Sequence, residues 1–341
     1  MKSDIISDAF PSFRVLEELG LYVWRPGCDS NDMLIPHARV KASDITGRLS
    51  VSDGGDDSLA KLLSGLKLHD SAEIPVICYS ALRFPLILRR DLPPQKFPNR
   101  FPNDAGYVVP LFVAFKRGLD LSTIDFILGG SSMDYLANRL LDPCDTCVYL
   151  AQKLRNLILF VKYKEYTQDY SHIGFQFERL VTGRQMEDVN GPDRVENLRV
   201  IKIGPFTCLV AADVDATDAS GNLVEIKSGN PNYFGIKLIL QMISSGSKIL
   251  VNADKRGQTL LGINRRTLGE LIREESTEEL KAAEMNIIES LTSLKQANIL
   301  ETVPSEIRFN GNNVILEDSN GKSILPSADV LEELLGSAEK L

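Results

Sequence analysis

Cysteine and histidine are scarce in this sequence of 341 residues, which has five cysteines and three histidines. The odd number and wide spacing of the cysteines argue against a disulfide framework. Cys144 and Cys147 form a Cys-x-x-Cys pair, but no second pair or nearby histidine completes a zinc site. We therefore expect reduced thiols and a reducing compartment, either the nucleus or the cytoplasm.

Long apolar runs are also missing. No stretch reaches the ~20 apolar residues that a membrane-spanning helix needs. The first residues, Met1 to Asp4, lack the hydrophobic region of a secretory signal. We expect no membrane partner. A Gly-x-x-x-x-Gly-Lys loop is absent as well, which argues against a P-loop nucleotidase.

Positive charge is in deficit, because the net charge is −8 and the sequence pI is about 5.1. Such a chain is not built to coat nucleic acid without specificity. If it binds nucleic acid, we expect a local basic groove or a metal site to do so. Basic pairs such as Arg89-Arg90 and Arg265-Arg266 can line such a groove or lie on ordinary solvated surface.

The pattern of apolar residues and turns predicts an α/β (α+β) fold, with a central mixed β-sheet flanked by helices. We expect a single domain over residues 1–341, with the core motifs in 120–270. Helices are predicted at 58–68, 134–141, 170–181, 234–245, from 276 onward and at 328–335. Strands are predicted at 148–163 in two pieces, 198–203, 206–216, 223–228, 248–253 and 259–264, with a hairpin around 310–312 and a proline-rich surface crossing at 91–106.

Acidic residues gather on two predicted strands joined by a turn at residues 218–222. Asp213 and Asp215 would share one face of the first strand, and Glu225 and Lys227 one face of the second, because strand side chains alternate. Three carboxylates and an ammonium among apolar neighbours are costly to bury unpaired. A divalent cation offsets that cost, since Mg²⁺ prefers oxygen ligands. The arrangement predicts a metal-dependent phosphodiesterase.

Asp215 followed by Glu225-Ile226-Lys227 matches the signature of the PD-(D/E)xK nuclease fold. Two further segments accompany it: Gly174 to Glu178 upstream, and Lys237 to Gln241 downstream. With these four segments in this order, the chain resembles the DXO decapping exoribonucleases as a divergent member. The family's motifs run Gly-Φ-x-Φ-Glu, Glu-x-Asp, Glu-Φ-Lys and Lys-x-x-x-Gln, where Φ is apolar.

The resemblance implies removal of incomplete or otherwise aberrant caps, or of 5′ pyrophosphate, followed by 5′-to-3′ degradation of the RNA. It implies two divalent ions, Mg²⁺ or Mn²⁺. Their ligands would be Glu178, Asp213, Asp215 and Glu225, with the Ile226 carbonyl as a further ligand. Lys227 and Gln241 would contact the scissile phosphate or orient the attacking water. The expected catalytic set is Glu178, Asp215, Glu225, Lys227 and Gln241, and the expected partner is the 5′ end of RNA.

Two positions depart from the family pattern. Gly129 stands where the family has an arginine, and Asp213 stands where it has a glutamate. The first change removes a charge-assisted phosphate contact, and the second shortens a metal ligand by one methylene. Both suggest an altered substrate or a slower enzyme.

Less specific interpretations stay open at this point. Glu178 and Gln241 can be ordinary polar helix residues, and Glu225 with Lys227 an exposed cross-strand pair. The alternative function is a catalytically weak or inactive relative that binds RNA 5′ ends or partners another exonuclease. A third class is a DNA endonuclease with the same fold.

Overall fold

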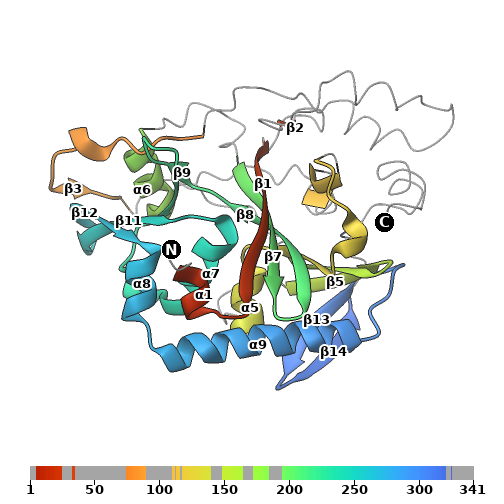
Figure 1. Ribbon diagram of the computed structural model, residues 1–341. Coiled ribbons are helices and arrows are strands. Elements are labelled where there is room, and N and C mark those ends of the chain that lie inside the picture. The colour runs from red at the N-terminus through yellow and green to blue at the C-terminus, as the bar shows by residue number, and fades with distance from the viewer. Residues whose placement is uncertain are drawn as a thin grey trace, which may run out of the picture.

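The computed structural model describes residues 5–24, 33–34, 74–89, 110–111, 113–115, 117–139, 148–163, 172–183, 194–319 and 324. The helices expected at 58–68 and 328–335 and the crossing at 91–106 lie outside the described residues. The described strands form two sheets that lie side by side, with helices packed against them (Figure 1).

The larger sheet is mixed and has the strand order β14-β13-β5-β6-β4-β8-β7-β1-β2. Its central strand β4 runs parallel to both β6 and β8, and the other pairs are antiparallel. Its strands are β1 (Phe13–Trp24), β2 (Met33–Leu34), β4 (Phe126–Gly129), β5 (Val148–Leu154), β6 (Leu157–Tyr163), β7 (Arg194–Ile203), β8 (Phe206–Asp213), β13 (Ser305–Asn310) and β14 (Asn313–Asp318).

The smaller sheet has the order β3-β12-β11-β10-β9. Its strands are β3 (Leu86–Ile87), β9 (Ala216–Thr217), β10 (Leu223–Lys227), β11 (Ile249–Arg256) and β12 (Thr259–Thr267). Only β10 and β11 are parallel, which requires a crossover connection between them. The helix α7 (Gly235–Ser245) makes that crossover.

Five further α-helices are described: α1 (Ile5–Ala9), α5 (Ser132–Asn138), α6 (Ile173–Thr182), α8 (Leu268–Glu274) and α9 (Thr277–Gln296). Short 3₁₀ turns are η1 (Tyr79–Ala81), η2 (Leu121–Thr123) and η3 (Pro231–Tyr233). Helix α9 runs along one side of the molecule, below α1 and α5 in Figure 1. None of the described helices is long and apolar enough to cross a membrane.

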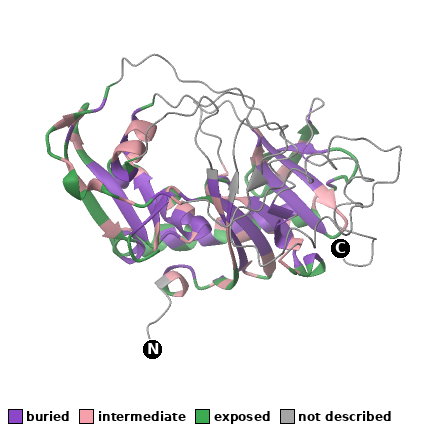
Figure 2. Ribbon diagram, turned by 90° about the horizontal axis from the view of Figure 1, so that it is seen from above, coloured by how far each residue is buried: buried purple, intermediate pink, exposed green. Residues whose placement is uncertain are grey.

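Three large apolar clusters are described, and two of them pack α-helices against the sheets. The first joins α5, α7 and α9 to one face of the larger sheet, with Phe126 and Phe160 fully buried. The second joins α6 to β10 and β11, through Phe177, Val224 and Val251. Buried residues follow the strands of both sheets (Figure 2). Burial of these side chains contributes about 1.5–3 kcal/mol each to folding.

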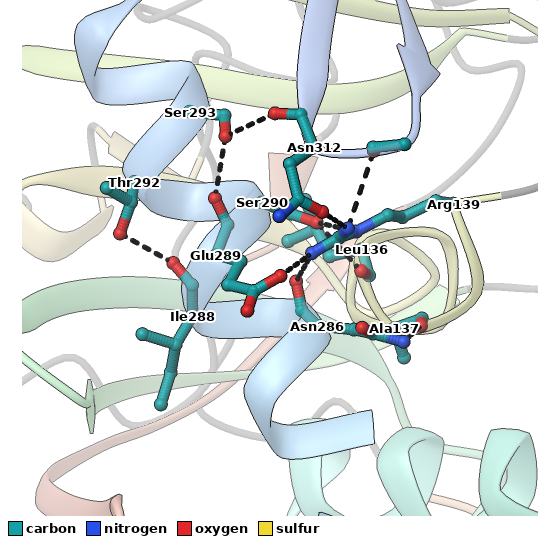
Figure 3. A network of polar contacts seen from close by, with 11 residues as sticks. Leu136, Ala137, Arg139, Asn286, Ile288, Glu289, Ser290, Thr292, Ser293 and Asn312 are labelled. Atoms are coloured by element: carbon teal, nitrogen blue, oxygen red, sulfur yellow. Dashed lines mark hydrogen bonds and ion pairs between the residues drawn. The ribbon is translucent and has the colours of Figure 1, made fainter. Parts of the chain in front are cut away.

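A polar network around Arg139 joins three elements at the far end of α5 (Figure 3). Arg139 ends α5 in the left-handed conformation, and each of its guanidinium nitrogens donates hydrogen bonds. The acceptors on α9 are Ser290 Oγ at 3.0 Å, the Asn286 carbonyl at 3.1 Å and Glu289 Oε2 at 2.8 Å. Those in the β13–β14 turn include the side chain of Asn312. This arginine ties α5, α9 and the hairpin together.

The expected fold class is confirmed, although the strands divide between two sheets rather than one. The predicted strand at 206–216 is wrong in one respect. The strand β8 ends at Asp213, and the chain then passes into the other sheet as β9. Regular alternation therefore stops at residues 214–215, so period 2 does not fix a shared face for Asp213 and Asp215.

Candidate active site

The hairpin β9–β10 is the centre of the candidate site. Its turn forms because the Asp218 carboxylate accepts hydrogen bonds from the backbone N–H groups of Ser220 and Asn222, each at 2.9 Å. The strand pairing then brings Asp215 beside β10, where Asp215 Oδ2 accepts the N–H of Ile226 at 2.7 Å. The predicted strand–turn–strand is confirmed, and it positions Asp215 directly beside the Glu-x-Lys strand.

Glu225 and Lys227 form an ion pair within the same strand. Lys227 Nζ lies 2.5 Å from Glu225 Oε1, and the side chains are 21% and 1% exposed. The other oxygen, Glu225 Oε2, is buried and has no hydrogen-bond partner among the described residues. An unpaired buried carboxylate oxygen is costly, because its hydration is lost without replacement. This pair is buried rather than an exposed cross-strand pair.

The charges around Asp215 are unbalanced in favour of negative charge. Burial raises the pKa of Asp215 well above its ordinary value, and the carboxylates of Glu225 and Glu178 raise it further. Lys227 and the Ile226 amide oppose that rise but do not cancel it. Burial by itself lowers the pKa of Lys227, but Glu225, Asp215 and Glu178 outweigh it, so its pKa is raised. Three carboxylates thus act on one ammonium.

Glu178 reaches this group from α6. The helix begins with His172, whose Nδ1 accepts the N–H of Gly174 at 3.2 Å. Its first turn lies against the segment after Lys227, since a Cβ on Gly174 would be 4.0 Å from Ser228 Oγ. The helix is fixed on β10 and β11 by Phe177 and its apolar neighbours. Glu178 is partly buried one turn further on.

Metal binding can be tested against these residues. Within the described ranges, no group of three or more His, Cys, Asp or Glu side chains is arranged to hold a metal ion. Mg²⁺, however, is usually bound by one or two carboxylates together with waters and substrate phosphates. Asp215 and Glu225 supply such a pair, and the unpaired Glu225 Oε2 is the kind of oxygen that a cation would satisfy. The residues therefore fit a divalent cation held by two carboxylates, with Glu178 close enough to act electrostatically.

The remaining predicted side chains lie on β8 and α7, outside this hairpin. Asp213 is the last residue of β8 and is exposed to solvent. It pairs with Glu196 of β7. Gln241 is partly buried on α7, and its role stays a prediction, as does that of the Ile226 carbonyl. Lys237, from the same motif as Gln241, is half exposed and pairs with Asp134 of α5 at 3.3 Å.

Gly129 is the last residue of β4, where it pairs with Ala211 of β8, and Gly130 follows it. A Cβ on Gly130 would lie 2.7 Å from the Ala212 Cβ, so this position requires glycine. A Cβ on Gly129 would lie 3.7 Å from Ser132 Oγ, which is an ordinary contact. The structure thus has room for the start of a side chain at the position where the family has its arginine.

Sequence reasoning missed Asn252 on β11. It is 3% exposed, and its Oδ1 has no hydrogen-bond partner in the described part of the chain. The sequence does contain a signal for this residue, because a polar side chain directly follows the apolar run Ile249-Leu250-Val251. In the structure, Asn252 is the register partner of Lys227.

No protein-family model matches the chain, and no curated protein matches it in sequence. Among solved structures, S. pombe Rai1 is similar with a TM-score of 0.53 at 15% sequence identity, covering 71% of this chain and 86% of that chain. S. pombe Rai1 in complex with 3′-FADP gives a TM-score of 0.49 at 17% identity over 72% and 96% of the two chains. Candida albicans Rai1 in complex with pU5-Mn²⁺ gives 0.49 at 11% identity over 71% and 82%.

The similarity to S. pombe Rai1 is one of fold, since the identity is only 15%. The resemblance drawn from the four sequence motifs is confirmed at the level of the fold. The chain thus has an α/β fold similar to that of S. pombe Rai1, with its carboxylate group at the β9–β10 hairpin.

Proposed function

We propose that this chain is a divalent-cation-dependent hydrolase that acts on the 5′ ends of RNA. The observation that carries the proposal is Glu225, buried with one oxygen on Lys227 and the other unpaired, beside Asp215 in a Rai1-like fold. The proposed reactions are removal of an aberrant cap or of 5′ pyrophosphate, and degradation from the 5′ end. RNA is the proposed substrate because the motifs follow the order of the decapping exoribonucleases.

Each residue has a chemical role in this proposal. A bound divalent cation supplies an activated water and neutralises charge on the phosphate. Asp215 and Glu225 hold the cation, and the Ile226 N–H fixes the orientation of Asp215. Lys227 places a permanent positive charge beside the phosphate, where negative charge develops during the reaction. Glu178 adds negative charge at the rim, and Gln241 is proposed to orient the water.

The test is a panel of RNAs that differ only at the 5′ end: monophosphate, triphosphate and capped. Each is incubated with the protein, with and without Mg²⁺ or Mn²⁺, and the products are resolved at single-nucleotide length. We expect cation-dependent release from the 5′ end by the wild type. We expect none from Glu225→Gln, while Glu317→Gln, an exposed carboxylate on β14, behaves as the wild type. Equal rates for wild type and Glu225→Gln would place catalysis elsewhere.

A second candidate, an RNA 5′-end binder without turnover, is favoured by two observations. Within the described ranges no group of three or more ligand side chains is arranged to hold a metal ion, and the resemblance implies that Gly129 stands where the family has an arginine. This candidate predicts saturable affinity for 5′-phosphorylated RNA with no product in the same panel. Gly129→Arg separates the two candidates further, because restoring the charge should strengthen RNA binding in both but raise the rate only in an enzyme.

A further inference from the structure

Asn252 lies directly beside Lys227. The strands β10 and β11 are parallel, and the register pairs Lys227 with Asn252. Residues paired in this way point to the same face of a sheet. Lys227 is the last residue of β10, and Asn252 is the residue of β11 at which the pairing with β10 ends.

The orientation of the Asn252 amide leaves its oxygen available. Asn252 Nδ2 donates to the carbonyl of Ala253 at 3.3 Å. The reverse orientation would set two oxygens against each other, so the hydrogen-bond pattern assigns this one. Asn252 Oδ1 is then buried with no donor among the described residues, at 3% exposure of the side chain. A buried amide oxygen without a partner is costly unless another state of the protein uses it.

Lys227 is the nearest candidate donor for this oxygen, because it is the register partner of Asn252. In this structure its ammonium is held by Glu225 Oε1. A divalent cation on the Glu225 carboxylate would repel that ammonium strongly, because the repulsion between like charges grows as their distance falls and is weakly screened at a buried site. The ammonium must then leave Glu225 and needs another acceptor close by.

We propose that Asn252 is a positioning residue that receives the Lys227 ammonium on its Oδ1 when a divalent cation binds Glu225. The proposal rests on the proposed function, since it concerns the same cation. A neutral amide suits this role, because it accepts a hydrogen bond without competing for the cation as a carboxylate would. Lys227 thereby stays charged and is held beside the phosphate instead of moving into solvent.

The test is a double-mutant cycle on cation affinity, measured by isothermal titration calorimetry with MnCl₂ and no RNA. The proteins are the wild type, Asn252→Leu, Lys227→Met and the double variant. We expect Asn252→Leu to bind Mn²⁺ about tenfold more weakly than the wild type, the effect of one hydrogen bond to a charged group. In the Lys227→Met background the same substitution should have no effect, because the displaced ammonium is absent.

Two results would overturn the proposal. One is equal Mn²⁺ affinity for Asn252→Leu and the wild type, and the other is an equal loss in both backgrounds, which indicates a merely structural role. If Asn252→Leu fails to fold by circular dichroism, Asn252→Val removes the same oxygen with a good strand former and carries the same expectations. A wild type that binds no Mn²⁺ contradicts the proposed function itself, whereas normal binding without coupling between the two positions contradicts only the role of Asn252.

Discussion

The Arg139 network and the Glu225 group are both built from charged side chains, but they differ in how well those charges are satisfied. All the guanidinium nitrogens of Arg139 have acceptors, and the partners belong to three separate elements. Glu225 is more deeply buried, yet one of its oxygens has no partner among the described residues. The Arg139 side chain is itself only 13% exposed, so both groups are largely buried. Burial alone therefore does not explain why one group is fully hydrogen-bonded and the other is not.

The difference separates a structural group from a functional one. Arg139 completes its hydrogen bonds within the chain and gains nothing from a ligand. The group of Asp215, Glu225 and Lys227 is left with an excess of carboxylates and an unpaired oxygen on Glu225. A carboxyl group whose pKa is raised by burial and neighbouring charges, as that of Asp215 is, is typical of functional sites. A bound cation would balance the negative charge of this group and give Glu225 Oε2 a partner, as the acceptors around Arg139 do for its guanidinium nitrogens.

The largest expected effect is on activity, from Glu225→Gln. This change keeps the shape of the side chain and removes the charge that would hold the cation. We expect the rate of 5′-end hydrolysis to fall about a thousandfold, comparable to removing a key electrostatic group from an active site. The measurement is kcat/KM on 5′-phosphorylated RNA. A loss of less than tenfold would contradict the assignment.

The next effect is on stability, from Arg139→Met. The substitution keeps an unbranched apolar stem, removes the guanidinium group and leaves the acceptors on α9 and in the hairpin turn unpaired. We expect the free energy of unfolding to fall by about 3 kcal/mol, with kcat per folded molecule unchanged. Urea denaturation measures the first quantity. Arg308→Met, at a half-exposed arginine of β13, is the matched control and should change the denaturation midpoint far less.

Gly130→Ala should cost about 2 kcal/mol of stability, because its Cβ would lie 2.7 Å from that of Ala212. Gly129→Ala, one residue earlier, meets only an ordinary contact and should leave the stability nearly unchanged. Thermal denaturation of the two variants checks the difference. Equal losses of stability in Gly130→Ala and Gly129→Ala would contradict the close contact between Gly130 and Ala212.

The smallest expected effect comes from Asp215→Asn and depends on pH. The raised pKa of Asp215 means that the folded protein holds a proton more tightly than the unfolded chain does. Its contribution to stability is therefore full below pH ~4 and is lost as the pH rises through the raised value. Asparagine keeps an oxygen for the Ile226 N–H. Without divalent ions, we expect the variant to be more stable than the wild type at pH 7 and equal to it at pH 4.

Saturating Mg²⁺ reverses the sign of that comparison, since the wild type then gains binding energy that the variant lacks. Chemical denaturation measures the difference in unfolding free energy between the wild type and Asp215→Asn. It is carried out at pH 4 and pH 7, with and without Mg²⁺. A wild type that is the more stable protein at pH 7 without divalent ions would contradict the electrostatic account of Asp215.

The sequence predicted the elements around the site well, because their signals are local. The turn at 218–222 follows from Asp218 and Gly221, and the helix after β10 from its apolar spacing. The hairpin at 310–312 follows from Asn310-Gly311. Motif order also indicated the fold, which is similar to that of S. pombe Rai1.

Long-range relations were less predictable. Periodicity along one strand cannot show that the chain leaves one sheet after Asp213 and joins another at Ala216. Nor can it show that Lys227 binds Glu225 or that Asn252 stands beside it, because both depend on strand register. The role of Asp213 as a metal ligand stays a prediction, because Asp213 and Asp215 lie on either side of this change of sheet.

The central claim is that Asp215 and Glu225 form a divalent-cation site, and anomalous X-ray scattering from crystals grown with MnCl₂ tests it most directly. We predict a manganese peak within about 2–2.6 Å of carboxylate oxygens of both residues, with Lys227 displaced from Glu225. A map with no manganese at the β9–β10 hairpin, and Lys227 still bound to Glu225, would contradict the account.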